Sequence, residues 1–194
     1  MFSGIVEYLG SVKSCLNDNK QSRIIIQIEN LEGVSIGTSV SVNGVCLTIS
    51  KIYNNEYYFD VSEETSTKTN LSELKNGSEV NIELPLTLHK FISGHIVSGH
   101  IDGKFQISKF EKIDDSWSLA LKMSDTLTRY IVIKGSVCVD GVSLTVNNIE
   151  NNIMSLMIIP HTYENTIIKN YKVGNSVNIE VDYIAKHLEK LKND

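Results

Sequence analysis

Two short stretches of this sequence carry side chains suited to acid–base or nucleophilic chemistry. The first is N-G-V-C-L-T, in which Cys46 follows an Asn-Gly pair, and the second is S-G-H-I-V-S-G-H, residues 93–100, which holds His95 and His100. An imidazole gains and loses protons near neutral pH, and a cysteine thiolate is a strong nucleophile. Cys46, His95 and His100 are therefore candidate catalytic residues.

The spacing of these residues disfavours a metal site. His95 and His100 lie five residues apart, and side chains five apart on a strand point to opposite faces. Cys15, Cys46 and Cys138 show no C-x-x-C spacing, which favours free thiols over zinc ligands or disulfides. The alternative to catalysis stays open at this point, because such histidines are often surface polar groups and such cysteines small buried apolar ones.

An internal duplication supplies the elements that position these residues. Residues 39–83 match residues 136–180 without a gap at an offset of 97, with identity at 18 of 45 positions. Asn43-Gly44 and Asp140-Gly141 occupy the same place in each copy, between β-branched runs, and both dipeptides favour tight hairpin turns. Short strands separated by regular turns predict an all-β barrel or sandwich in each half.

Polar residues differ between the two copies at equivalent positions. Cys46 corresponds to Ser143, and each is followed by Leu-Thr. A second match, of residues 2–7 to residues 97–102 at an offset of 95, indicates the first strand of each repeat and places His100 opposite Ile5. The second copy alone has Pro160, which we expect to interrupt a strand and free main-chain groups to bind a planar ring. Two related pockets with unequal roles are the simplest interpretation.

The internal repeat predicts two domains, and the residues that follow them predict a terminal helix. We expect an N-terminal barrel at residues 1–86 and a C-terminal barrel at 87–182, with a linker at roughly 85–92 near Pro85. In residues 183–194, Ile184, Leu188 and Leu191 follow helical spacing, with Asp182 as the N-cap. This helix either docks on its own barrel or packs against the same helix in other subunits.

Charge and hydropathy narrow the range of partners. The net charge is −5, and no run of Lys or Arg marks a nucleic-acid surface. The first residues lack the pattern of a signal peptide, and 18 apolar residues never run together. We therefore expect a cytoplasmic protein that binds a small molecule or another protein, with no nucleic-acid or membrane partner.

Taken together, the motifs resemble riboflavin synthase of the alpha-chain type. The motifs are M-F-S-G-I-V-E at the N-terminus, N-G-V-C-L-T, S-G-H-I-V-S-G-H-I-D-G, D-G-V-S-L-T-V and I-P-H-T, and they span essentially the whole chain. The resemblance implies two six-stranded Greek-key barrels, a homotrimer formed with the terminal helix, and possible association with lumazine synthase. It also implies that the reaction joins the N-terminal barrel of one subunit to the C-terminal barrel of a neighbour.

The reaction implied by the resemblance is a dismutation. Two molecules of 6,7-dimethyl-8-ribityllumazine exchange a four-carbon unit to give riboflavin and 5-amino-6-ribitylaminouracil, without a metal or redox cofactor. One substrate donates the unit and the other accepts it, which would explain why the two halves have diverged. The nearest alternative is a non-catalytic lumazine- or flavin-binding relative, and a more distant one is a β-barrel nucleic-acid module, which the acidic balance disfavours.

The resemblance also carries site residues onto matching positions. His100 would shuttle protons, and Cys46 or Ser39 would assist addition at the ring. The implied catalytic set is Phe2, Ser39, Cys46, His95, His100, Thr145 and Asp182. The implied substrate contacts are Gly4, Ile5, Val6, Cys46, Leu47, Thr48, Asp60, Val61, Ser62, Glu63, Glu64, Thr65, Gly99, His100, Ile101, Lys134, Ser143, Leu144, Thr145, Met157, Ile158, Ile159, Pro160, His161 and Thr162.

Overall fold

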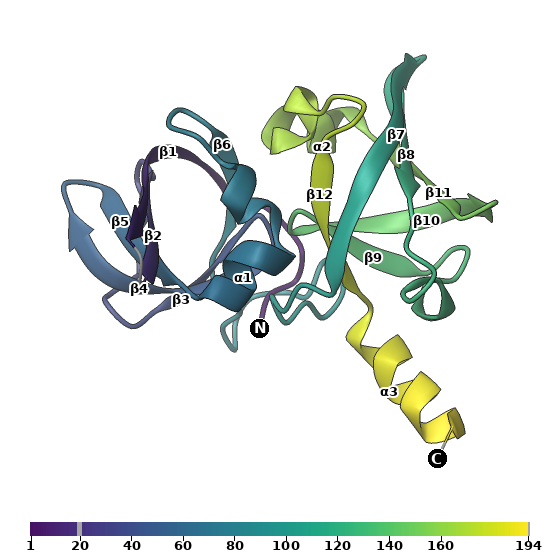
Figure 1. Ribbon diagram of the computed structural model, residues 1–194, viewed down its shortest axis with the longest axis horizontal. Helices are drawn as coiled ribbons and strands as arrows, with labels where there is room; N and C mark the ends of the chain where they lie inside the picture. The colour runs from purple at the N-terminus through teal and green to yellow at the C-terminus, as the bar shows by residue number, and fades with distance from the viewer. Residues whose placement is uncertain (19–20, 194) are drawn as a thin grey trace.

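The computed structural model describes residues 1–18 and 21–193 and contains two closed antiparallel β-barrels side by side (Figure 1). Barrel 1 consists of β1 (Tyr8–Asp18), β2 (Gln21–Gln27), β3 (Ser39–Val42), β4 (Val45–Tyr53), β5 (Glu56–Val61) and β6 (Glu79–Glu83). Their order around the barrel is β1-β2-β5-β4-β3-β6. Because β2 lies beside β5 while β3, β4 and β5 are joined by hairpins, the order is that of a Greek key.

Barrel 2 repeats this arrangement. Its strands are β7 (Gly103–Ile113), β8 (Ser116–Lys122), β9 (Ser136–Val139), β10 (Val142–Glu150), β11 (Ile153–Ile158) and β12 (Ser176–Val181). They close in the order β10-β11-β8-β7-β12-β9, which is the equivalent circuit. The prediction of an all-β domain in each half is confirmed, and so are the two six-stranded barrels that the resemblance implies.

The turn residues act as their types predict. Asn43 and Gly44 have φ of 46° and 81°, and Asp140 and Gly141 have φ of 45° and 81°. Two successive positive φ values are those of a type I′ hairpin, whose twist matches the flanking strands. In both copies, the second residue after the turn points outward at the same place in the strand. Cys46 pairs with Ser41, and Ser143 pairs with Cys138.

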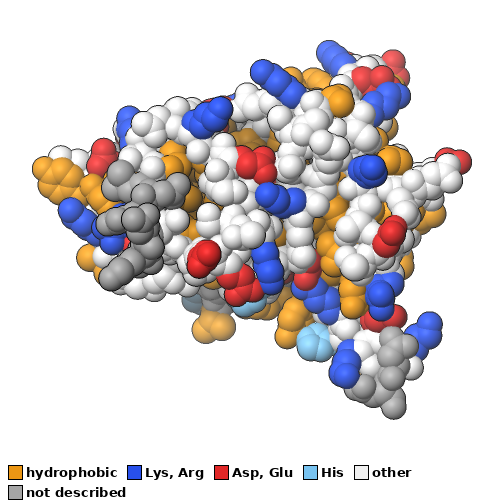
Figure 2. Space-filling view, viewed as in Figure 1, with side chains coloured by type: hydrophobic (Ala, Val, Ile, Leu, Met, Phe, Trp, Pro, Cys, Tyr) orange, Lys and Arg blue, Asp and Glu red, His pale blue; other side chains and the backbone are white. Residues whose placement is uncertain are grey.

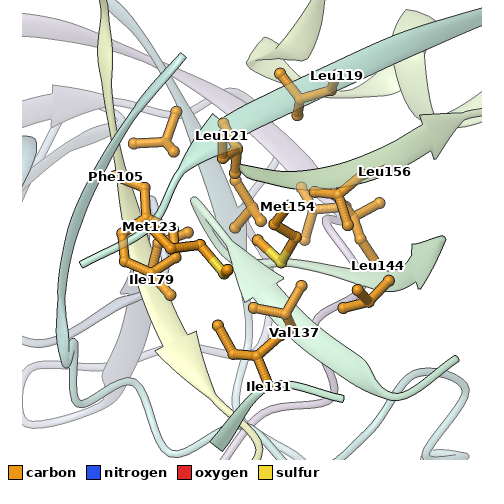
Figure 3. Packing of buried hydrophobic residues seen from close by; sticks show 14 of the residues in the cluster. Phe105, Leu119, Leu121, Met123, Ile131, Val137, Leu144, Met154, Leu156 and Ile179 are labelled. Carbon is orange, nitrogen blue, oxygen red and sulfur yellow. The ribbon is translucent and has the colours of Figure 1, made fainter. Parts of the chain in front are cut away.

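Each barrel is filled by its own apolar side chains. Figure 3 shows this packing in barrel 2, where Leu119, Leu121, Val137, Met154 and Ile179 converge on the interior and each is 0 % exposed. The burial of β10 alternates, with Val142, Leu144 and Val146 inside, so the residues between them face outward. This alternation sets Ser143 and Thr145 on the outer surface of the barrel.

The two barrels meet around a pseudo-twofold axis through their equivalent turns. A Cβ added to Gly44 would lie 2.8 Å from the amide nitrogen of Gly141, and the reverse distance is the same. Beside this contact, the side-chain amide of Asn178 donates to the carbonyl of Asn43 (2.9 Å), and that of Asn81 donates to the carbonyl of Asp140 (2.8 Å). Buried polar groups thus replace apolar packing at the centre of the interface.

The segments that precede β1 and β7 do not form the first strand of either barrel. Residues 2–7 and 97–102 were expected to be those strands, but β1 begins at Tyr8 and β7 at Gly103. Phe2 and Val97, which are equivalent, instead pair with each other through hydrogen bonds of 2.7 and 3.1 Å. The N-terminus consequently lies at the junction of the barrels (Figure 1).

Three α-helices accompany the strands in the part of the chain that the structure describes. Helix α1 (Glu63–Lys68) is capped by Ser62, and α2 (Pro160–Asn165) begins at Pro160. Pro160 therefore does not interrupt a strand as expected: β11 ends at Ile158, and proline suits the first helical position because its missing N–H needs no partner there. Helix α3 (Tyr183–Asn193) extends away from both barrels (Figure 1), and in the described residues no helix is long and apolar enough to cross a membrane.

Candidate functional site

The first candidate site is a cavity of about 270 Å³ on the outer face of barrel 1. Cys46 of β4 forms one wall, Glu64 and Thr65 of α1 form another, and His100 closes a third side. Helix α1 is held over Cys46 by its cap, in which the hydroxyl of Ser62 accepts a hydrogen bond of 3.1 Å from the amide of Thr65. A thiol, an imidazole, a carboxylate and a hydroxyl thus line one small space.

His100 reaches barrel 1 although it belongs to the segment that leads into barrel 2. The amide of Cys46 donates to the carbonyl of Gly99 (2.9 Å), and Gly99 has a φ of 84°. A Cβ at Gly99 would lie 2.5 Å from the Cβ of Cys46, so only glycine allows this approach. Gly99 therefore brings the next residue, His100, to the rim of the Cys46 cavity.

The second candidate site is the equivalent surface of barrel 2. Here the amide of Ser143 donates to the carbonyl of Gly4 (2.7 Å), and a Cβ at Gly4 would lie 2.7 Å from that of Ser143. The hydroxyl of Ser143 also lies 2.7 Å from Nδ1 of His95. Barrel 2 thus receives its neighbouring segment from the start of the chain, just as barrel 1 receives residues 99–101.

His95 and His100 consequently serve different sites. His95 lies beside Ser143, and His100 lies beside Cys46. Burial lowers the pKa of His95 below its usual 6.5, and the nearby charges of Asp182 and Glu180 oppose this effect in part. Its Nε2 atom is buried and has no hydrogen-bond partner within the described residues.

Other predicted residues lie on the same outer faces. Ser39 pairs with Thr48 beside Cys46, and Thr145 pairs with Ser136 beside Ser143. The amide of Lys134 donates to the carbonyl of Val146 (2.8 Å), next to Thr145. Three apolar side chains on this side of barrel 2 are exposed. They are Ile5, which follows Gly4, at 41 %, and Met157 and Ile159, in and just after β11 beside β10, at 42 % and 56 %.

Some of the predicted residues do not present their side chains on these two surfaces. Leu47 and Val61 lie in the core of barrel 1, and Leu144 and Ile158 lie in the core of barrel 2. Asp60 forms an ion pair with Arg23 (2.7 Å) on the surface of barrel 1. Gly4 and Val6 belong to the first of two crossing segments, residues 2–7 and 97–102, where Gly4 contacts Ser143 and Val6 packs on the barrel 2 core. Ile101 belongs to the second and lines the Cys46 cavity. Glu63 begins α1, and His161 and Thr162 lie in the first turn of α2.

Phe2 lies buried between the barrels, and Asp182 caps helix α3. Phe2 is 0 % exposed and packs with Val97 and Cys138 between the barrels, and Cys46 contacts this cluster. The carboxylate of Asp182 accepts a hydrogen bond of 2.8 Å from the amide of Ile184 at the start of α3, as the N-cap prediction requires. Phe2 therefore supports the Cys46 site from behind rather than covering it.

Several residues that shape these surfaces were not predicted from the sequence. Lys68 and Thr69 line the Cys46 cavity, and Lys68 forms an ion pair with Glu64 (2.7 Å) one helical turn earlier. A larger cavity of about 510 Å³ between the barrels is lined by Asn43, Asn70, Asp140 and Tyr171 among others, and contains none of the predicted site residues. Glu83 and Glu180, the last residues of the repeated V-N-I-E blocks, are also buried, and the acid at the end of an apolar strand was the available signal.

Comparison with known proteins gives the family. The lumazine binding domain model matches twice, at residues 3–85 and 98–182, so that it takes in both crossing segments and both barrels. The riboflavin synthase of Bacillus subtilis is 38 % identical over 189 residues, which cover 97 % of this chain and 88 % of that protein. The chain belongs to the riboflavin synthase family. The member from Mycobacterium bovis is 37 % identical and is covered over 98 % of each chain.

Solved structures agree with this membership of the riboflavin synthase family. LumP complexed with riboflavin superposes with a TM-score of 0.88 at 26 % identity, covering 93 % of this chain and 99 % of LumP. LumP complexed with 6,7-dimethyl-8-(1'-D-ribityl) lumazine gives a TM-score of 0.85 at the same identity. The duplicated barrel is thus shared by riboflavin synthases and by a protein crystallised with a lumazine and with a flavin.

Proposed function

We propose that this chain is a riboflavin synthase that transfers a four-carbon unit between two molecules of 6,7-dimethyl-8-ribityllumazine. The observation that carries this proposal is the pair of equivalent surfaces with unequal polar groups, Cys46 with His100 on barrel 1 and Ser143 with His95 on barrel 2. The whole-length identity to riboflavin synthases supports it. The atoms of the two substrates divide between riboflavin and 5-amino-6-ribitylaminouracil, so the reaction consumes neither an oxidant nor water.

The two bound lumazines undergo different steps, so the two sites need different catalytic groups. One lumazine loses a proton from a methyl group, and the resulting carbanion attacks the ring of the other, to which a nucleophile has added. His100 is suited to carrying the proton, and Cys46 or Ser39 to assisting addition, because all three border the barrel 1 surface. Thr145 and Asp182 would act from barrel 2. Stacking of two reactive rings supplies much of the rate through proximity.

We further propose that the reacting surfaces belong to different subunits of a cytoplasmic homotrimer. The apolar stripe of α3 supports this, since Ile184, Leu188 and Leu191 are 55, 62 and 73 % exposed in the single chain. The exposed apolar rim around Ser143 also lacks a cover within the described chain. Residues 1–86 and 87–182 would each bind one lumazine, residues 183–194 would join the subunits, and association with lumazine synthase would involve the assembled trimer.

The decisive experiment supplies the purified protein with 6,7-dimethyl-8-ribityllumazine alone. We expect riboflavin and 5-amino-6-ribitylaminouracil to appear in equal amounts, one of each for every two lumazines consumed. Heat-denatured protein serves as the control. Tight binding of the lumazine without product would contradict the proposal and favour a non-catalytic binding protein of the same fold.

A further inference from the structure

Two buried carboxylates hold the segments that cross between the barrels. Glu180, in β12 of barrel 2, is 1 % exposed, and Glu83, at the end of β6 in barrel 1, is 2 % exposed. Burying an ionised carboxylate is costly unless hydrogen bonds replace its water. Among the described residues, neither glutamate forms an ion pair within 4.0 Å, so neutral donors must provide that compensation.

The donors are the same in both copies. One oxygen of Glu180 accepts bonds of 2.7 Å from the amide and the hydroxyl of Ser98, and the other accepts 2.8 Å from the amide of Gly99. Glu83 binds the equivalent pair, with 2.7 and 2.8 Å to Ser3 and 3.0 Å to the amide of Gly4. Each carboxylate thus fixes two consecutive amides of a Ser-Gly pair.

These bonds determine where the segments can place their next residue. With its amide held by Glu180, Gly99 keeps a φ of 84° and presents its carbonyl to the amide of Cys46. His100 follows directly and lines the Cys46 cavity. A carboxylate in barrel 2 therefore controls an imidazole at the surface of barrel 1, and Glu83 controls Ile5 at Ser143 in the opposite direction.

We propose that Glu180 is a positioning residue that places His100 against Cys46, and that Glu83 is its counterpart for the surface at Ser143. The effect on turnover rests on the proposed function, whereas the effect on the crossing segments does not. A purely structural role would give the two glutamates similar effects on stability and none that acts through His100, because each buries three similar hydrogen bonds. A positioning role makes each glutamate specific for one site.

Glutamine substitutions test this distinction with each variant serving as the control for the other. Glu180→Gln keeps one acceptor oxygen but turns an NH2 group toward the amide of Gly99, so two donors face each other. Site-resolved hydrogen exchange then reports on the segment, because the Cys46 amide is bonded to Gly99 and the Ser143 amide to Gly4. We expect Glu180→Gln to speed exchange at Cys46 at least tenfold with little change at Ser143, and Glu83→Gln to do the reverse.

Alkylation of Cys46, located by peptide mapping, gives a second measurement that needs no turnover. The rate of alkylation at Cys46 should be several-fold higher in Glu180→Gln than in Glu83→Gln. Cys138, which is 1 % exposed, serves as the internal reference. If either glutamine variant fails to fold, Ser98→Ala and Ser3→Ala form a milder pair, because each removes the hydroxyl bond to its glutamate. Ser98→Ala also removes the 3.2 Å bond that this hydroxyl accepts from the amide of His100. Equal changes at both sites in both variants would overturn the proposal.

A double-mutant comparison links the segment to His100. If Glu180 acts through this imidazole, Glu180→Gln should lower kcat about tenfold or more in the wild-type chain but add little to His100→Gln. For Glu83→Gln combined with His100→Gln, the fold losses in kcat of the two single variants should instead multiply. Fully multiplicative losses for Glu180→Gln would overturn the positioning role. A wild-type protein that makes no riboflavin would refute the proposed function, while the exchange and alkylation results would still decide the proposal about the segments.

Discussion

The amide of Cys46 donates a 2.9 Å hydrogen bond to the carbonyl of Gly99, which joins barrel 1 to the segment that leads into barrel 2. This contact depends on a glycine, since a Cβ there would lie 2.5 Å from the Cβ of Cys46 and the φ is 84°. Adding a single methyl group at Gly99 should therefore push this segment away from barrel 1. The equivalent contact between Ser143 and Gly4 has the same character.

Gly99→Ala should therefore lower the free energy of unfolding by more than the roughly 1–2 kcal/mol expected for a positive φ alone. It should also abolish most turnover, because His100 is displaced from Cys46. Chemical denaturation and riboflavin formation measure the two effects. Gly174→Ala is the matched control, since Gly174 has a φ of 91° but open space around its Cα, so the strain appears without the collision.

His100→Gln and Cys46→Ser should each lower kcat by about tenfold or more, because a positioned acid–base group or nucleophile is removed without a large change in volume. Steady-state rates with the lumazine check this. Cys15→Ser is the control, since this thiol lies in β1 and donates to the carbonyl of Leu74, away from the cavity. Near-normal turnover in both site variants would exclude the assigned roles.

The imidazole of His95 should titrate below pH 6.5. Burial lowers its pKa, so the folded state resists protonation, and folding stability falls as the pH drops below the unfolded value toward the folded one. Ring-proton NMR, with His95→Gln to assign the signal, measures the midpoint directly. A midpoint above 6.5 would show that the charges of Asp182 and Glu180 outweigh burial.

Asp140 should make the stability depend on pH in the opposite direction. Burial raises its pKa from 3.8 to about 7, despite hydrogen bonds from Tyr171, Asn178 and Asn70. The folded state thus keeps a proton that the unfolded chain releases, and stability falls as the pH rises from about 4 to 7. Asp140→Asn, which keeps acceptors for Asn70 and Asn178 and can donate to Tyr171, should flatten this dependence.

The gain from Asp140→Asn at pH 8 should reach at most about 4 kcal/mol, since each pKa unit corresponds to about 1.36 kcal/mol. Urea denaturation between pH 4 and pH 8 provides the measurement. Asp115→Asn, at an exposed turn, is the charge-matched control and should leave the pH dependence unchanged. An equal pH dependence in wild type and Asp140→Asn would mean that the buried carboxyl stays ionised throughout.

If the proposed trimer forms through α3, truncation after Asp182 should give a smaller species. The removed helix carries the exposed stripe of Ile184, Leu188 and Leu191, and little of it contacts the barrels, as its extended course in Figure 1 shows. Sedimentation velocity of the full and shortened chains measures the change. An oligomer of the same size after truncation would rule out α3 as the assembly element.

The fold was predictable because its determinants are local and repeated. The Asn43-Gly44 and Asp140-Gly141 turns carry their conformation in their residue types, and the alternation in β4 and β10 follows from them. The charged groups in Figure 2, interspersed over the visible face, likewise agree with the absence of a basic stretch in the sequence. Short helices α1 and α2 were missed, since six residues carry too little periodicity to reveal a helix.

The site was predictable only in part, because its assembly depends on contacts between distant segments. Residue types selected Cys46, His95 and His100, but nothing within residues 93–100 indicates that His95 joins Ser143 while His100 joins Cys46. The expected first strands were wrong for the same reason. The Ser-Gly pairs at positions 3–4 and 98–99 look like strand residues, yet their amides bond to carboxylates rather than to a neighbouring strand.

The crossing of these two segments also suggests the order of events in the origin of the protein. A half-length ancestor that lent its first residues to a second copy would have been a symmetric dimer with two identical pockets, each built from both molecules. Duplication and fusion of that single gene would keep the pairing of Phe2 with Val97. It would also release each copy to mutate independently, so that a shared ancestral residue could become Cys46 in one half and Ser143 in the other.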